Sequence, residues 1–216
     1  MTTTLNRKTL LQTLKHSAIG VTRQEVLEQS DSFCFVEGEL ITFSDHIMTR
    51  CDSPIPDLTA AVPVQRLLKL LDKFPDEDVT VSFKNGRLTF SAGKRARSSW
   101  LSVQNEITLP YAAVPQPTEW KKVRTGLPNL LLQAARITSS SQALPLATVV
   151  HVTSKRVEAC DNARAFRAEL RTGLSECFIP GASVLKLEGM ELKEVSLDEN
   201  WVHFKTPTHQ ISLCCQ

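Results

Sequence analysis

The feature that most constrains the fold of this chain is a residue pattern that occurs twice. LITFSDHIMTR, which begins at Leu40, alternates up to Asp45, and RVEACDNARAF, which begins at Arg156, alternates up to Asp161. The other matched positions are Pro63 and Pro180, Leu68–Leu70 and Leu185–Leu187, Val81 and Val195, and Phe90 and Phe204. Their spacing stays between 114 and 117 residues, which indicates duplication rather than coincidence. The chain is therefore expected to contain two related units in series.

Each half repeats one order of local patterns: helix, strands, helix, strands. Apolar residues with helical spacing cover residues 7–18, 61–74, 127–140 and 178–190. Hairpin patterns cover residues 32–44, 78–92, 147–160 and 192–206, and single strands are predicted at 95–103 and 209–215. Asn6 is a suitable N-cap for the first helix, and Asn85-Gly86 favours a tight hairpin turn. The sequence predicts an α+β fold of two tandem duplicated domains, each with two helices packed on a mostly antiparallel sheet.

A proline-rich connector separates the two predicted domains. Domain 1 is expected at residues 1–103, the connector at 104–120 and domain 2 at 121–216. The connector contains three prolines within its length, which is typical of extended chain. We expect it to be exposed.

Composition argues against several classes of protein. Of the 216 residues, 42% are apolar, which is enough for a real core, and the net charge of +2 is too balanced for a histone-like binder. The six cysteines form no CxxC pair and no cysteine–histidine group with zinc spacing. The N-terminus has no apolar signal core, and no run is long enough to span a bilayer. We expect a reduced, cytoplasmic protein.

Residues that suggest catalysis are few and scattered. Cys160 and His151 would supply a nucleophile and a base for a hydrolase, but no motif surrounds them. Asp45 and Asp161 are possible metal ligands, although their position at strand ends favours a role in turns. No glycine-rich phosphate loop is present. We predict no enzyme activity, no metal and no cofactor.

The order of motifs resembles that of a known family. NRKTLLQTLKHSA, GELITFSDHIMTRC and AAVPVQRLLKLLDKFPDEDVTVSFKNGRLTFSAGKRARSSWLSV resemble the first domain of a bacterial-type DNA polymerase sliding clamp, the β subunit of DNA polymerase III. LPNLLLQAARITSSSQALP, RVEACDNARAFRAEL, FIPGASVLKLEG and VHFKTPTHQISL resemble its second domain. The resemblance implies a DNA-clamp fold and a ring that encircles double-stranded DNA, with helices lining the hole. It also implies a DNA polymerase and a clamp loader as partners, and no chemistry of its own.

Two departures from this family stand out. Bacterial clamps close the ring with two chains of three domains, whereas this chain has two domains. Either three copies form a trimeric ring, or the natural chain continues past Gln216. The family segment Gly-His-Arg-Leu, which helps form the pocket for partner peptides, is replaced by residues 162–165, and only Arg164 is retained.

Basic residues on the polar faces of the expected helices are the candidates for DNA contacts. Sequence-independent binding to duplex DNA needs scattered cations that meet phosphates, without a base-reading group. The candidates are Lys8, Lys15, Arg66, Lys69, Lys73, Arg136 and Lys186. Arg95 and Arg97 form a further basic pair, expected on a strand or loop at the rim. The alternative is that all of these are ordinary solvated faces of amphipathic helices.

Apolar residues near the connector are the candidates for binding a partner. The connector offers Ile107, Leu109 and Tyr111, and His46, Ile47 and Met48 are placed to form an opposite wall, with Arg164 retained from the family pocket. A peptide held there by a few apolar side chains would be a typical hot-spot arrangement. The alternative is that these residues seal the seam between domains. The competing function is a clamp-fold adapter or decoy that forms no ring and acts in replication control or transcription.

Overall fold

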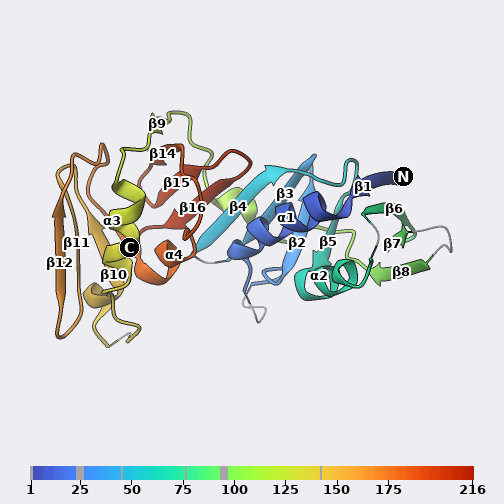
Figure 1. Cartoon of the computed structure of the whole chain (residues 1–216), viewed down its shortest axis with the longest axis horizontal. Coiled ribbons are helices and arrows are strands. Elements are labelled where there is room, and N and C mark those ends of the chain that lie inside the picture. Colours follow the sequence, from blue (N-terminus) through green and yellow to red (C-terminus); the bar gives the residue numbers. More distant parts are fainter. Residues whose placement is uncertain (1, 23–26, 45, 76, 93–96, 142) are drawn as a thin grey trace. The chain divides into compact units, whose positions relative to one another are not determined.

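The chain divides into two compact units. The computed structural model describes residues 2–22, 27–44, 46–75, 77–92, 97–141 and 143–216 (Figure 1). The first unit ends at Ala113 and the second begins at Val114, so the division falls inside the proline-rich segment 104–120. Within the described residues, none of the helices combines the length and the apolar composition needed to cross a bilayer.

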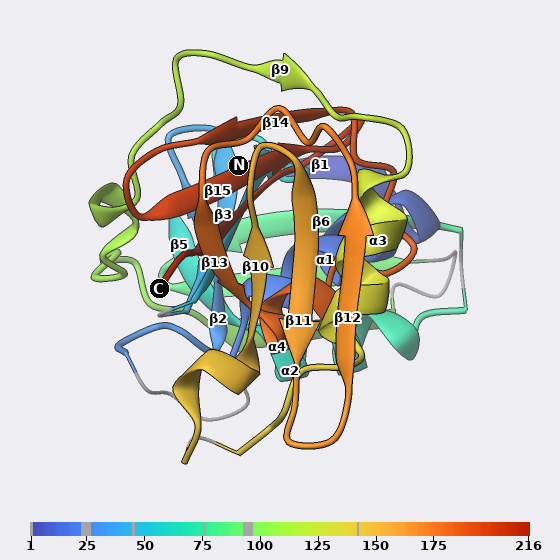
Figure 2. The same ribbon diagram turned by 90° about the vertical axis from the view of Figure 1, so that its left-hand side faces the viewer.

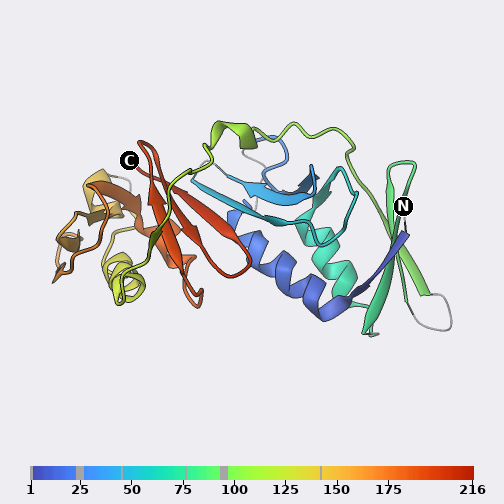
Figure 3. The same cartoon turned by 90° about the horizontal axis from the view of Figure 1, so that it is seen from above.

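Unit 1 contains two sets of four paired antiparallel strands, and two helices pack against them. Its elements are β1 (Thr2–Asn6), α1 (Arg7–Ser17), η1 (Ala18–Gly20), β2 (Ser32–Val36), β3 (Glu39–Phe43), β4 (Ile47–Asp52), β5 (Ala60–Pro63), α2 (Val64–Asp72), β6 (Asp78–Lys84), β7 (Arg87–Ala92), β8 (Arg97–Ser102) and η2 (Tyr111–Ala113). The strands of this unit pair in the orders β1-β6-β7-β8 and β5-β2-β3-β4. Figure 3 shows α1 and α2 side by side against β2–β5, and one apolar core joins both helices to both sets of strands.

Unit 2 repeats this organisation. Its elements are β9 (Lys121–Lys122), α3 (Leu127–Ala135), η3 (Pro145–Thr148), β10 (Val149–Val152), β11 (Arg156–Cys160), β12 (Ala165–Glu169), β13 (Cys177–Pro180), α4 (Gly181–Leu185), β14 (Glu194–Leu197), β15 (Trp201–Lys205) and β16 (Gln210–Cys214). Its strands pair in the orders β9-β14-β15-β16 and β13-β10-β11-β12. Figure 2 shows the second of these in orange, with α3 next to it. The α+β fold is as predicted.

The strand registers confirm that the two units share one fold, as the sequence repeat predicts. Val81 pairs with Phe90 between β6 and β7, and Val195 pairs with Phe204 between β14 and β15. These are the residues that the sequence repeat had matched. The strand orders of the two units also correspond one to one, from β1-β6-β7-β8 to β9-β14-β15-β16. Asp45, the repeat partner of Asp161, lies outside the described residues.

The local turn and cap predictions are confirmed. Asn85 and Gly86 have φ of 50° and 69°, the left-handed geometry that a two-residue hairpin turn requires. Glu37 and Gly38 form the equivalent turn between β2 and β3, with φ of 52° and 80°. Asn6 caps α1, because its side-chain oxygen accepts a hydrogen bond from the Thr9 N–H at 3.1 Å.

The helix predicted at residues 178–190 is wrong over much of its length. Residues Cys177–Pro180 form strand β13, which pairs with β10, and only Gly181–Leu185 is helical. The short apolar run at residues 177–180 is compatible with either a strand or a helix. It forms a strand because it pairs with β10. Pro63 plays the same part as Pro180, since each ends a strand and caps the following helix with φ near −55° (−57° and −53°).

The predicted helix at residues 127–140 also proves too long. It ends at Ala135, and the Thr138 hydroxyl donates to the Ala135 carbonyl at 2.8 Å. The same carbonyl also accepts a hydrogen bond from the Thr138 N–H at 3.2 Å, so it keeps two donors where the helix ends. The structure therefore has shorter helices and more strands than the sequence pattern indicated.

Candidate nucleic-acid interface

Helix α1 separates apolar and basic residues cleanly. Leu10 and Leu14 are buried in the core of unit 1, whereas Lys8 and Lys15 are exposed. Arg7, at the start of the helix, donates to the Leu71 carbonyl at the end of α2 at 3.4 Å. The helix contains no acidic residue. Its outer face is therefore positively charged along its length.

Helix α2 shows the same separation. Leu67 and Leu71 are fully buried, and the three predicted cations, Arg66, Lys69 and Lys73, are exposed. Lys73 occupies the C-cap, where a positive charge also complements the helix dipole. The positive charges of α2 outnumber its single acidic residue on the exposed face.

The helices of unit 2 carry less charge. Arg136 is exposed at the C-cap of α3, and Lys186 is exposed at the C-cap of α4. Arg136 forms an ion pair with Glu188, which neutralises part of its charge locally. Desolvation of Lys186 lowers the pKa of its ammonium group. All seven predicted DNA contacts are exposed, and their role in binding DNA stays a prediction.

The residues predicted to bind a partner are largely buried. Ile47, Met48 and Leu109 are 2%, 1% and 3% exposed. His46 is exposed, and Ile107 and Tyr111 are half-buried. Most residues of the connector are exposed, as expected, but Leu109 and Val114 are buried. A pocket built from these residues stays a prediction, with only His46, Ile107 and Tyr111 accessible.

Arg164 is engaged in a turn. The Asp161 carboxylate accepts hydrogen bonds from the Ala163 N–H at 2.8 Å and the Arg164 N–H at 2.6 Å. The Arg164 guanidinium binds the same carboxylate at 2.7 Å. These hydrogen bonds hold the pKa of the Asp161 carboxyl below its ordinary value. The bond from the Ala163 N–H has the largest effect, and those from Arg164 follow. This arrangement matches the turn role expected for Asp161.

A serine–histidine–aspartate arrangement that sequence reasoning missed lies in unit 2. The His203 ring contacts the Ser212 hydroxyl at 2.7 Å and the Asp198 carboxylate at 2.8 Å. Ser212 and His203 are fully buried, so no substrate reaches the hydroxyl. The network satisfies polar groups inside the sheet, and it is a structural feature.

The cysteine–histidine pair considered for hydrolysis is not formed. Both ring nitrogens of His151 are held by carboxylates, by Glu158 at 3.2 Å and by Glu176 at 2.8 Å. Its ring also stacks on Phe178. His151 is therefore not placed to activate the exposed Cys160. Within the described chain, no group of three or more acidic, histidine or cysteine side chains is placed to hold a metal ion.

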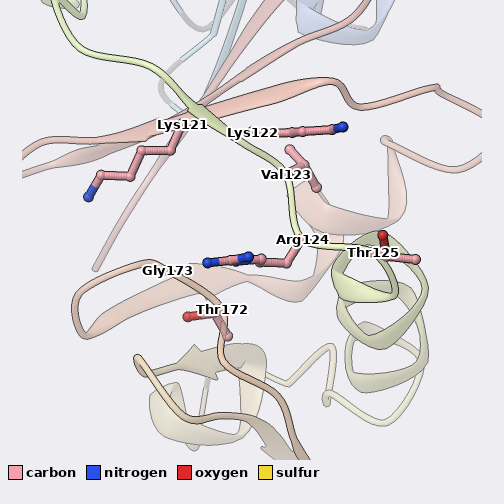
Figure 4. Close-up of a pocket in the computed structure, with 7 residues that line it drawn as sticks. All are labelled: Lys121, Lys122, Val123, Arg124, Thr125, Thr172 and Gly173. Atoms are coloured by element: carbon pink, nitrogen blue, oxygen red, sulfur yellow. The ribbon is translucent and has the colours of Figure 1, made fainter.

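One cavity was missed by sequence reasoning. A depression of about 440 Å³ in unit 2 is lined by Lys121, Lys122, Val123, Arg124, Thr125, Thr172 and Gly173 (Figure 4). A signal for it was present in the sequence, since WKKVRTG places three cations within four residues. Thr172 and Gly173 could not be assigned to the cavity from local sequence. They lie in a loop about fifty residues further along the chain and reach the cavity only when unit 2 folds.

Solved structures of bacterial sliding clamps share this fold. The DNA polymerase sliding clamp of Bacillus subtilis matches with a TM-score of 0.83 at 17% identity, over 100% of this chain and 64% of that chain. The DNA polymerase III β chain of Streptococcus pneumoniae matches with a TM-score of 0.82 at 15% identity, over 100% and 64%. The β subunit from Bartonella birtlesii, solved with griselimycin bound, matches with a TM-score of 0.79 at 15% identity, over 100% and 65%.

These matches are structural. No family sequence model and no curated protein sequence matches the chain. The chain spans less than two thirds of the length of the clamps it resembles. Over all of its own length, however, it has the tandem-domain fold of the bacterial DNA polymerase sliding clamps.

Proposed function

We propose that this protein is a DNA sliding clamp, a processivity factor that encircles duplex DNA without reading its sequence and tethers a polymerase. The observation that carries the proposal is the outer face of α1 and α2. Lys8, Lys15, Arg66 and Lys69 are all exposed there, opposite leucines that are buried in the core. Cations spread along helices meet phosphates weakly and at many positions, which allows a protein to slide.

Ring closure requires more than one copy, because six clamp domains surround DNA in the family that the sequence resembles. Three copies of this two-domain chain would supply six. Strand β8 is an edge strand of unit 1, where within the described residues it pairs only with β7, and β12 is an edge strand of unit 2, where it pairs only with β11. We propose that β8 of one copy joins β12 of the next, because open strand edges pair readily and repeated head-to-tail contact can close a ring.

An exposed aromatic residue supports an interface at β8. Trp100 is 54% exposed, and the Arg87 guanidinium lies over its ring at 4.5 Å. A large aromatic side chain held in place by a cation is typical of residues that become buried when proteins associate. Light scattering on wild-type protein and on the Trp100→Ala variant tests this step, and we expect the variant to shift toward monomer.

Retention on DNA tests the function itself. The protein is loaded onto nicked circular plasmid and onto the same plasmid after linearisation, and the fraction that remains bound is measured by gel filtration. A clamp stays on circles and slides off free ends. Equal retention on both substrates would contradict encirclement. A strict monomer that is retained on neither would favour the adapter alternative.

A charge variant tests which face meets DNA. Replacing Arg66 and Lys69 by alanine removes two exposed cations from α2 without burying a new group, and alanine is a good helix former. Each phosphate contact contributes about 0.9 to the slope of log affinity against log salt, so the slope should fall by about 1.8. The matched control replaces two exposed lysines, Lys84 at the end of strand β6 and Lys155 in the loop between β10 and β11. If the salt slope falls equally in both variants, the assignment of α2 to the DNA interface is wrong.

A further inference from the structure

The cavity of unit 2 gathers positive charge from strand β9 and the turn that follows it. Figure 4 shows the side chain of Arg124 extending toward Gly173 and Thr172, whereas Lys121 extends to the same side but ends farther from that loop and Lys122 extends the opposite way. Successive residues of a strand point to opposite faces, so Lys121 and Lys122 diverge as their positions require. Among the described residues, those that line the cavity include no acidic side chain.

The cations of the cavity are not neutralised by neighbours. The ion pairs among the described residues do not include Lys121, Lys122 or Arg124. Glu194 lies opposite Lys122 in the strand register, but it is paired with Lys205 at 3.4 Å. Surface lysines and arginines commonly gain little from ion pairs, yet a concave group of cations without an acid attracts anions.

The facing loop contains a backbone N–H that has no partner among the described residues. Gly173 has φ of 78°, and its N–H makes no hydrogen bond to another described residue. The neighbouring Thr172 hydroxyl is already used, since it donates to the Thr153 carbonyl at 2.6 Å and accepts from the Leu174 N–H at 3.1 Å. Thr172 therefore holds the loop in place and leaves Gly173 at the cavity wall.

We infer that this cavity binds a phosphate group, with Arg124 as a planar donor, Lys121 as a point charge and the Gly173 N–H as a third donor. Phosphate fits better than an acidic peptide, because Val123 is the single large apolar side chain in the lining and offers no pocket for an anchor. The volume exceeds that of a lone phosphate and leaves room for an attached sugar. The assignment of that phosphate to the DNA backbone rests on the proposed function.

Two measurements on one pair of variants test the site. The first is the salt dependence of binding to a short fluorescent duplex, and the second is calorimetric titration with inorganic phosphate at low salt. Both are made on wild-type protein, on Lys121→Ala/Arg124→Ala and on the control Lys84→Ala/Lys155→Ala, which loses the same charge. We expect the cavity variant alone to lose phosphate binding and to lower the salt slope by about 1.8.

Each outcome has a distinct meaning. Loss of both signals in the cavity variant supports a site for backbone phosphate. Loss of phosphate binding with an unchanged DNA slope supports a site for a free phosphorylated compound. If the cavity variant and the control behave alike in both measurements, the inference is overturned. Retention of wild-type protein on circular plasmid is scored separately, so failure of the clamp function and failure of this site are distinguishable.

Discussion

A methyl group added at Gly181 should disrupt the contact between α3 and α4. Gly181 is the first residue of α4, and a Cβ atom there would lie 2.1 Å from the Thr138 hydroxyl oxygen. It would also lie 2.9 Å from the Thr138 Cβ and Cγ2 atoms. Ordinary contacts between such atoms are about 3.5–4.0 Å, so the residues must move apart. Thr138 follows α3, which makes this contact a direct link between the two helices of unit 2.

The cost can be worked out from the atoms involved. Rotation of Thr138 moves its hydroxyl but leaves its Cβ too close, so part of the strain must be taken up by the backbone. Rotation also breaks the bond from the hydroxyl to Ala135, which contributes about 1 kcal/mol. Overpacking typically costs about 1–3 kcal/mol, and alanine in place of glycine in a helix returns up to about 1 kcal/mol. We expect Gly181→Ala to lower the free energy of unfolding by about 1–3 kcal/mol.

A double-mutant cycle identifies the cause. Thr138→Ala removes two of the three close atoms, so Gly181→Ala should cost less in that background than in the wild type, with a coupling of about 1 kcal/mol or more. Denaturant midpoints measured at constant m-value give the four free energies. The reasoning is refuted if Gly181→Ala unfolds at the wild-type midpoint, or if the two substitutions are simply additive.

Two further predictions concern titration and thiol chemistry. The pKa of Asp161 is held low by the N–H groups of Ala163 and Arg164 and by the Arg164 side chain, so its contribution to stability is present above the unfolded-state pKa and is lost as pH falls through the folded value. Carboxyl chemical shifts should show Arg164→Ala raising that pKa, and no change would contradict the assignment. Burial raises the pKa of the Cys34 thiol to about 12, whereas Cys160 is exposed. Mass spectrometry after brief alkylation at pH 8 should find Cys160 modified and Cys34 unmodified, and rapid labelling of Cys34 would argue against its burial.

Sequence predicted those parts of the fold that depend on neighbouring residues. The turn at Asn85-Gly86 needs two residues with positive φ, and few residue pairs adopt that geometry easily. The cap at Asn6 is likewise decided by an oxygen three residues from its donor. The exposure of Arg66 and Lys69 followed from helical spacing around Leu67, because a helix with one buried stripe must expose the opposite side.

Parts that depend on distant partners were not predictable in this way. Strand β13 was read as helix because residues 177–180 carry no clear period, and pairing with β10 determines their structure. Strand β9 has only two residues, Lys121 and Lys122, and it exists because β14 offers an edge for it. The cavity needs Gly173 beside Arg124, which no local pattern implies.

The helices of unit 2 carry less positive charge than those of unit 1, and this difference suggests how the cavity would contribute to DNA binding in the proposed function. Helix α1 has no acidic residue, whereas Arg136 of unit 2 is paired with Glu188. If both units meet the same duplex, the helices of unit 2 offer it fewer free cations than those of unit 1. Lys121 and Arg124 would make up that difference, because they add two cations that no acid of the described chain neutralises. On this argument, removing the cavity cations should weaken DNA binding more than replacing Arg136, whose charge is already shared with a carboxylate.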